Sequence, residues 1–181
     1  QCKILKVYLT GGEPLLIPET LWYVKPLREN GIFTVLTTNG VLLDPASIRT
    51  LSDHGLNRIQ VSIHGSRPEI NDAIMGGHAF ERIIKALGWI HDAGLDLHIK
   101  VTITRENIHD LPRLVQRLLP FEPSLINASE ITPTGRGFLN YESLRPLEKE
   151  LREALDKIQS LNELGVKVSF KNHTLHFIQT G

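Results

Sequence analysis

The sequence predicts an α/β fold with a parallel sheet, and within that class it favours a partial barrel of the TIM type. Apolar, β-rich runs alternate with segments of helical period along the 181 residues, which is typical of repeated βα units with right-handed crossovers. No G-x-G-x-x-G motif opens the first unit, so a dinucleotide-binding sheet is disfavoured. Unequal helix lengths and too few βα units argue against a complete eightfold barrel.

The expected strands are runs dense in Val, Ile and Leu, a composition typical of strands that are covered on both faces. In chain order they span residues 4–9, 33–37, 58–63, 97–104, 125–131 and 167–170. The expected helices lie between the strands, where apolar residues recur at helical spacing. They span residues 18–29, 45–53, 79–93, 108–119 and 147–164.

Glycines mark the ends of four of these helices. Gly31, Gly55, Gly94 and Gly165 each follow a helical segment and lead into the next strand. A glycine adopts the left-handed conformation that commonly ends a helix at no steric cost. Each of the four is therefore expected to close one αβ unit.

Composition bounds the class of protein. The chain is 41% hydrophobic and 22% charged, with 20 basic and 20 acidic residues, so its formal charge is zero. This balance argues against nucleic acid and membrane surfaces as partners, and no apolar run approaches the roughly 18 residues of a membrane span. Cys2 is the one cysteine, which excludes an intramolecular disulfide and favours the cytoplasm.

We expect one domain over residues 1–181 and an internal fragment of a longer protein. The chain begins at Gln1, its one methionine is Met75, and a predicted strand starts already at residue 4.

The most informative motif is Gly11-Gly12-Glu13-Pro14, directly after the first strand. The glycines let a ligand approach the main chain closely, and the carboxylate accepts from an ammonium group. This combination suits a small zwitterionic ligand. Taken alone, the motif is more simply a turn.

Polar and glycine residues follow four further strands, at residues 37–40, 62–65, 100–107 and 132–137. In a parallel barrel the carboxyl ends of the strands gather at one face, where functional groups collect. Each cluster alone reads as a loop rich in turn-forming residues. Five clusters at the same end of the strands predict a site.

These motifs resemble the core domain of radical S-adenosylmethionine enzymes, in the branch of molybdenum-cofactor, quinone-cofactor, haem and peptide-modifying maturases. The resemblance covers about residues 4–170 and rests on LTGGEPLL, TTNGVLL, VSIHG, an Asn after the fourth strand and PTGRG. It implies a partial (β/α)6 barrel without its first βα unit, S-adenosylmethionine, and a [4Fe-4S] cluster held by cysteines outside this chain. It also implies a 5′-deoxyadenosyl radical, an electron donor such as flavodoxin or ferredoxin, and a peptide, cofactor precursor or other small molecule as substrate.

The resemblance also implies roles for particular residues. Gly11, Gly12, Glu13 and Pro14 resemble the element that receives the methionyl amino group, and Ser62 resembles the position that hydrogen-bonds the ribose. The remaining cofactor-side candidates share the same rim or the adenine-packing strand; they are Thr38, Asn39, His64, Ile131 and Thr132.

Three residues are candidates for substrate binding: Lys100, Asn107 and Arg136. For Lys100 a solvated strand edge is an equally good interpretation, and Arg136 is as simply explained as a loop cap. His64 has a structural interpretation beside the ligand-binding one.

The sequence departs from the family pattern in three places. The cluster motif CxxxCxxC is missing, and Cys2 lies too close to Gly11 to belong to it. One cysteine does not hold three irons, so the motif is expected upstream. His64 replaces an Asp. Met75 stands where relatives often have an Arg for the methionyl carboxylate, which leaves Arg105 or Lys100 for that task.

Two other functions compete with a radical enzyme. A degenerate module would bind S-adenosylmethionine without a cluster, and the upstream sequence decides between the two. An unrelated aldolase would use Lys100 as a Schiff base, but this leaves the GGEP and TTNG motifs unexplained. No metal site is expected among the eight histidines, since no metal-binding spacing accompanies them.

Overall fold

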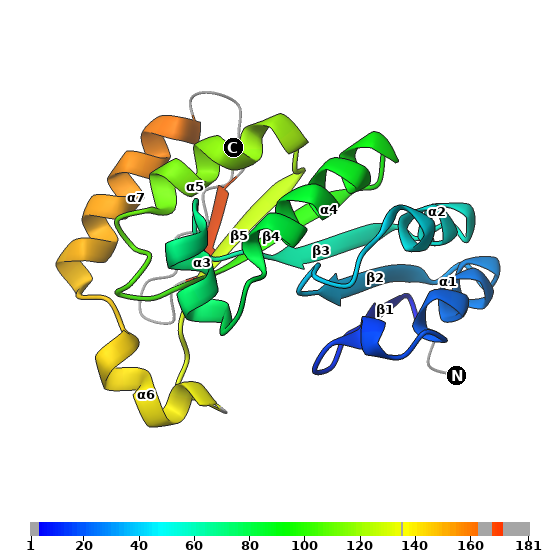
Figure 1. Ribbon diagram of the computed structural model, residues 1–181, viewed down its shortest axis with the longest axis horizontal. Coiled ribbons are helices and arrows are strands. Elements are labelled where there is room, and N and C mark those ends of the chain that lie inside the picture. Colours follow the sequence, from blue (N-terminus) through cyan, green and yellow to red (C-terminus); the bar gives the residue numbers. More distant parts are fainter. Residues whose placement is uncertain (1–3, 135, 163–167, 172–181) are drawn as a thin grey trace.

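The computed structural model describes residues 4–134, 136–162 and 168–171. Its centre is a parallel sheet in the order β1-β2-β3-β4-β5-β6, curved as in a barrel (Figure 1). The predicted fold class is confirmed. The strands are β1 Lys6–Leu9, β2 Phe33–Thr38, β3 Arg58–Ser62, β4 Leu97–Ile103, β5 Leu125–Glu130 and β6 Val168–Lys171.

The five expected helices form, with small shifts at their ends. They are α1 Thr20–Glu29, α2 Pro45–Asp53, α4 Phe80–Asp92, α5 Leu111–Leu118 and α7 Glu148–Asn162. The sequence interpretation missed four shorter elements at the loops. They are η1 Pro14–Leu16, α3 Pro68–Met75, η2 Leu119–Phe121 and α6 Arg136–Leu144.

Helix α5 begins later than expected, at Leu111 rather than at residue 108. The preceding residues form a turn in which the Asn107 and Ile108 N–H groups donate to the Thr104 carbonyl. Asn107 and Asp110 are buried in this turn and bind the loop after β3, as described below. Tertiary contacts of polar side chains thus hold these residues outside the helix.

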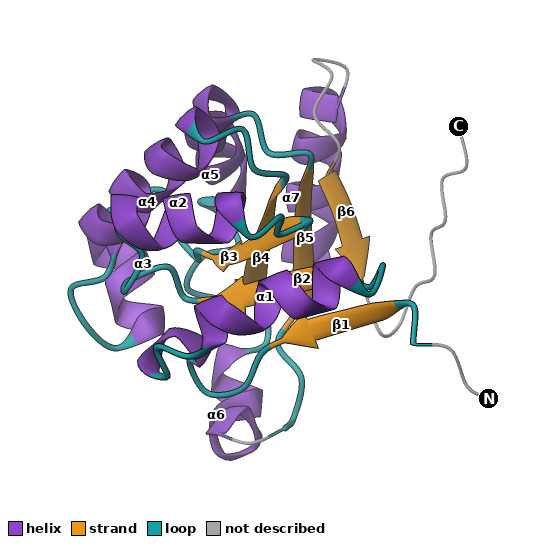
Figure 2. Ribbon diagram, turned by 90° about the vertical axis from the view of Figure 1, so that its right-hand side faces the viewer, coloured by secondary structure: helices purple, strands orange, loops and turns teal. Residues whose placement is uncertain are grey.

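The core lies between the sheet and the helices on its outer side (Figure 2). Strands β3, β4 and β5 bury alternate residues only, and the buried set packs with α4 residues such as Ile83, Leu87 and Ile90. The expectation that the strands are covered on both faces is therefore wrong for these three. Their inner face carries polar side chains instead: Arg58, Gln60, Ser62, His98, Lys100, Thr102, Asn127 and Ser129.

Three of the predicted glycine caps are confirmed. Gly31, Gly55 and Gly94 have φ of 70°, 77° and 64°, the left-handed region that glycine adopts without strain. Gly165 lies outside the described residues. Each of the three directs the chain from a helix into the following strand, so their spacing along the sequence sets the βα repeat.

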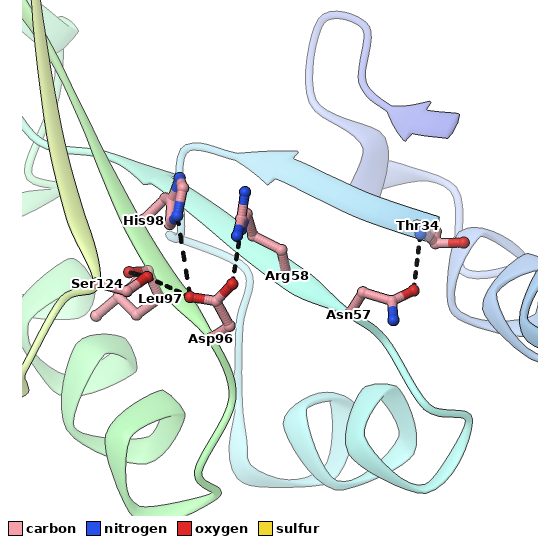
Figure 3. Close-up of polar contacts among 7 residues, drawn as sticks. All are labelled: Thr34, Asn57, Arg58, Asp96, Leu97, His98 and Ser124. Carbon is pink, nitrogen blue, oxygen red and sulfur yellow. Dashed lines mark hydrogen bonds and ion pairs between the residues drawn. The ribbon is translucent and has the colours of Figure 1, made fainter. Parts of the chain in front are cut away.

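Polar contacts join the amino ends of the strands (Figure 3). Arg58 Nε donates to Asp96 Oδ2 at 2.7 Å, and the Ser124 hydroxyl donates to the other oxygen of the same carboxylate. Burial lowers the pKa of the neighbouring His98, and the charge of Arg58 lowers it further. These residues lie at the end of the barrel where interactions serve stability rather than chemistry.

None of the helices in the described part of the chain is both long enough and apolar enough to cross a membrane.

Candidate cofactor and substrate site

Glu13 links the loops that follow β1 and β2. Its Oε1 accepts from the Thr38 hydroxyl at 2.7 Å and from the Leu15 N–H at 3.1 Å. Its Oε2 accepts from the Asn39 N–H at 2.7 Å. A carboxylate has about four acceptor positions, so Oε2 keeps one for a ligand. The residue therefore both holds the two loops together and retains capacity for an ammonium group.

Gly11 and Gly12 form an open ledge beside this carboxylate. Both are exposed, and a Cβ built on either would meet no heavy atom of the protein within 4 Å. Neither has a positive φ, so the fold itself does not require glycine here. The free space above the main chain is what a closely approaching ligand needs.

Pro14 supports the ledge from below. It is buried, and its carbonyl accepts from the Thr20 hydroxyl at 2.7 Å. This bond ties η1 to the first turn of α1. Pro14 is thus held inside the protein, whereas the two glycines are exposed and Glu13 is half-buried.

The turn after β2 is built around Thr38, whose buried hydroxyl also accepts from the Gly40 N–H at 3.0 Å. Gly40 has φ of 79°, and a Cβ there would lie 2.9 Å from Val61 Cγ1, so glycine is required at this position. Asn39 Oδ1 accepts from the Val41 N–H at 2.9 Å. Within the described residues, Asn39 Nδ2 donates to no acceptor, so this amide group is free to donate to a ligand at the rim.

At the end of β3, Ser62 lies half-buried on the inner face, and His64 follows it. His64 Nδ1 accepts from the Thr102 N–H at 3.0 Å. The bond fixes the tautomer, because the ring proton must then be on Nε2. Burial lowers the pKa of His64 to about 4, with a further contribution from the charge of Lys100. The imidazole is therefore a neutral N–H donor at physiological pH.

Three buried polar side chains hold the loop that carries His64. Asn71 Oδ1 accepts from the His64 N–H, and Asn107 Nδ2 donates to the His64 carbonyl, both at 2.8 Å. The Asp110 carboxylate accepts from the Ser66 N–H at 2.6 Å and from its hydroxyl at 2.7 Å. Both peptide groups flanking His64 are thus fixed from inside the protein.

Asn107, which was predicted to contact substrate, belongs to this brace. It is fully buried, and its amide also donates to the Thr102 carbonyl and accepts from the Thr104 N–H, each at 2.8 Å. Sequence reasoning missed Asn71 and Asp110. Their one signal was the presence of short polar residues that bind backbone groups in turns.

Lys100 is exposed on the inner face of β4, where it lies between Ser62 of β3 and Asn127 of β5 in the sheet register. Asn127 Oδ1 is buried and has no hydrogen-bond partner in the described part of the structure. An unpaired buried acceptor is unfavourable. The middle of the inner face therefore presents a cation beside an unsatisfied acceptor.

The end of β5 completes the rim on the other side. The Ile131 N–H donates to the Ile103 carbonyl at 3.0 Å, and the Thr132 hydroxyl lies 3.0 Å from that of Thr134. These bonds place Ile131 and Thr132 beside the end of β4. Arg136 is the first residue of α6, but its side chain lies outside the described part of the structure.

Met75 and Arg105 are the residues for which the resemblance raised the question of a methionyl carboxylate partner. Met75 is half-buried, with its sulfur 3.5 Å from Asn71 Nδ2, so it packs on the brace of the His64 loop. Arg105 is exposed just beyond β4, where its N–H donates to the Leu144 carbonyl at 2.7 Å. Arg105 and Lys100 thus both remain candidates for binding this carboxylate.

The site as described fits S-adenosylmethionine but not an iron–sulfur cluster. The open ledge, the spare oxygen position of Glu13 and the hydroxyl of Ser62 match an amino group and a ribose. In the described ranges, no group of three or more His, Cys, Asp or Glu side chains is arranged to hold a metal ion. The residues described here therefore do not provide cluster ligands.

Comparison with known proteins identifies related sequences. The model of the radical SAM superfamily matches residues 2–118. The chain is 34% identical over 161 residues to the probable GTP 3′,8-cyclase of Sulfurisphaera tokodaii, covering 86% of this chain and 51% of that protein. It is 26% identical over 163 residues to the PqqA peptide cyclase of Rhodopseudomonas palustris, covering 88% and 43%. The chain thus spans about half the length of these relatives.

Solved structures share the fold. A domain of pyruvate-formate lyase-activating enzyme from Bacteroides vulgatus matches with a TM-score of 0.72 and 19% identity, covering 91% of this chain and 98% of that domain. Streptococcus suis SuiB bound to S-adenosylmethionine matches with a TM-score of 0.77 and 17% identity, covering 96% and 42%. At these identities the likeness concerns the fold alone.

Proposed function

The chain belongs to the radical SAM superfamily, and from this premise we propose that it is the S-adenosylmethionine-binding core of a radical enzyme. The observation that carries the proposal is the Glu13 carboxylate. It is fixed by Thr38 and Asn39 beside an open glycine ledge, the arrangement that an amino group of the cofactor requires.

In this proposal different rim residues bind different parts of the cofactor. Glu13 accepts from the methionyl ammonium, and Gly11 and Gly12 let the main chain approach it. Ser62, Asn39 and the Nε2–H of His64 supply hydrogen bonds to the ribose. A single rigid rim holds these donors and acceptors, because the loops after β1 and β2 are bonded to each other and the β3 loop is braced from inside.

The remaining rim residues complete the pocket. Ile131 and Thr132 offer the adenine an apolar side chain and backbone groups at the end of β5. With Met75 in place of an arginine, Arg105 or Lys100 is the partner of the methionyl carboxylate. Arg136 is a further candidate for an anionic substrate group.

The family implies a [4Fe-4S] cluster, whose chemistry is electron transfer to the sulfonium to yield a 5′-deoxyadenosyl radical. Its ligands would come from cysteines outside the described residues, and reduction would come from a donor such as flavodoxin or ferredoxin. The barrel described here would bind and orient the cofactor, and it would exclude water from the site.

The substrate proposed for the whole protein is a peptide or a cofactor precursor. Two relatives support this range, since their names describe a peptide cyclase and a GTP cyclase. The competing proposal is a barrel that binds S-adenosylmethionine without radical chemistry. The presence or absence of a three-cysteine motif in the full-length sequence discriminates between the two proposals.

The test uses the full-length gene product, reconstituted anaerobically with iron and sulfide. S-adenosylmethionine binding is measured by equilibrium dialysis, and 5′-deoxyadenosine is assayed after adding dithionite. We expect both binding and product, and we expect Glu13→Gln and Ser62→Ala to weaken binding. Glu81→Gln changes an exposed glutamate on α4 and serves as the matched control.

The outcomes separate the two functions. Product that disappears when upstream cysteines are replaced by alanine supports the radical enzyme. Binding that depends on Glu13 and Ser62, without product, supports the degenerate module. No binding at all contradicts both proposals.

A further inference from the structure

We propose that the inner face of β4 and β5 binds a substrate group in which a carboxylate lies next to an amide N–H, as in a peptide with an acidic residue. Lys100 would bind this carboxylate, which leaves Arg105 as the partner of the methionyl carboxylate, and Asn127 Oδ1 would accept from the N–H. The inference rests on the proposed function, because it names the class of substrate for the same site.

The charge of the inner face is the first argument. By the alternation of buried and less buried residues, the inward side chains of β1–β5 include Lys6, Arg58 and Lys100 but no Asp or Glu. The whole chain has equal numbers of acidic and basic residues. The positive charge of this face is therefore a local segregation, and it favours an anionic group on the substrate.

Of these three cations, Lys100 is the one left for a ligand. Arg58 is paired with Asp96 at 2.7 Å. The Lys6 ammonium lies over the rings of Tyr8 and Phe33, 4.8 and 5.1 Å from their centroids. Lys100 is exposed, and no carboxylate of the described residues lies within 4 Å of its ammonium. In the sheet register it is the neighbour of Ser62, the last residue of β3.

Asn127 supplies the second half of the argument. It is the register neighbour of Lys100 on β5, and its Oδ1 is buried without a partner among the described residues. Buried acceptors are almost always bonded. A ligand N–H reaching this oxygen would satisfy it, while a second anion would be repelled by it.

The spacing of these two groups favours a peptide carboxylate over a phosphate. Neighbouring strands lie about 4.8 Å apart, so a ligand that engages both residues must carry its anion and its N–H within a few ångströms. The amide N–H and carboxylate of an acidic residue meet this condition. A phosphate ester supplies the anion without an adjacent N–H.

The experiment uses the immobilised full-length protein with S-adenosylmethionine and without reductant, so that no turnover occurs. The probes are two pools of N-acetylated pentapeptide amides with random flanks, one with Glu and one with Gln at the centre, and GTP as the phosphate probe. Retained probe is quantified by mass spectrometry. The proteins are the wild type, Lys100→Gln, Lys100→Arg, Asn127→Leu and, as an exposed-lysine control on α4, Lys85→Gln.

We expect the wild type to retain the Glu pool about tenfold better than the Gln pool, the ratio that 1.4 kcal/mol gives. Lys100→Gln should abolish the preference, Lys100→Arg should keep most of it, and Lys85→Gln should match the wild type. Asn127→Leu should weaken retention of both pools, because it removes the acceptor of the N–H. Circular dichroism confirms that each variant folds.

Equal retention of both pools by the wild type would overturn the inference, as would Lys100-dependent retention of GTP in preference to the Glu pool. S-adenosylmethionine binding is measured in the same preparations. If the cofactor binds but the acidic preference is missing, this inference alone fails. If the cofactor does not bind, the proposed function fails, and this inference fails with it.

Discussion

Gly12 is a position at which a substitution should affect ligand binding without affecting the fold. A Cβ on Gly12 would meet no protein atom within 4 Å, and its φ is not positive. Alanine is therefore compatible with the folded chain, and its effect on the free energy of unfolding should stay within about 0.5 kcal/mol. If a cofactor lies against this ledge, the added methyl group occupies its space.

We therefore expect Gly12→Ala to weaken S-adenosylmethionine binding by tenfold or more without lowering stability. Equilibrium dialysis measures the first quantity and thermal unfolding measures the second. Gly88→Ala is the control, because Gly88 lies on α4 and also has free space around it. Unchanged binding by Gly12→Ala would contradict the assignment of the ledge.

The lowered pKa of His64 leads to a prediction about how the stability of the protein depends on pH. Burial, followed by the charge of Lys100, lowers its pKa from 6.5 to about 4. The unfolded chain therefore binds a proton below pH 6.5 that the folded chain does not bind. Its contribution to stability is fully present above pH 6.5 and is lost as pH falls toward 4, by up to roughly 3 kcal/mol.

NMR titration of the full-length protein tests this prediction. The His64 ring should keep its Nε2–H tautomer and should not titrate between pH 5.5 and 8. His64→Gln should remove the part of the stability loss that falls between pH 6.5 and 4. A His64 resonance that titrates near pH 6.5 would show that the ring is neither buried nor held by the Thr102 N–H.

At the scale of elements, the turn from β3 to α3 depends on a glycine for reasons of space. A Cβ on Gly65 would lie 2.6 Å from the backbone nitrogen of Asn71 and 2.8 Å from Ile70 Cβ. Both atoms belong to α3, so the helix would have to move away from the turn. That movement would also break the bond from the His64 N–H to Asn71.

Gly65→Ala should therefore lower the free energy of unfolding by about 1–3 kcal/mol and weaken cofactor binding at the same time. Gly88→Ala, inside helix α4, should instead stabilise by about 0.4–1 kcal/mol. Denaturant unfolding compares the two variants. Equal stability of the two variants would mean that α3 moves away from the added methyl group at no cost. The close packing of this turn would then not require glycine at position 65.

The same comparison of elements shows what the sequence can and cannot predict. Strand positions were predicted to within about two residues, because glycine caps and apolar runs are local signals. Helices α3 and α6 were missed, since each is short and lies in a loop at the rim. Asn71 was missed because it binds the backbone N–H of His64, a group that every residue but proline has. Asp110 was missed because its partner Ser66 lies 44 residues away in the sequence.

The polarity of the inner face was misjudged for a related reason. In β4 the residues His98, Lys100 and Thr102 alternate with apolar ones, and in β3 Gln60 and Ser62 do the same, so the alternation was present in the sequence beneath its high content of Val, Ile and Leu. Composition alone does not tell which side the helices cover. The register of β3, β4 and β5, which brings Ser62, Lys100 and Asn127 into one row, emerges only from the folded sheet.

At the scale of the whole molecule, cofactor binding and radical generation are expected to be separable. The rim proposed to bind S-adenosylmethionine is built from the carboxyl ends of β1 to β5 and the residues that follow them. Cluster ligands are a different matter, because the sequence has one cysteine and three thiolates are needed to leave one iron open for the cofactor.

We expect these 181 residues, produced alone and reconstituted anaerobically with iron and sulfide, to show no stable [4Fe-4S] absorption and to form no 5′-deoxyadenosine. The full-length protein treated in parallel should show both, and Cys2→Ser in it should leave both unchanged, since Cys2 is nine positions before Gly11. Absorption and electron paramagnetic resonance spectra measure the cluster. A stable cluster in the isolated piece, lost on Cys2→Ser, would mean that this cysteine is a ligand, and the separation of binding from radical generation would be wrong.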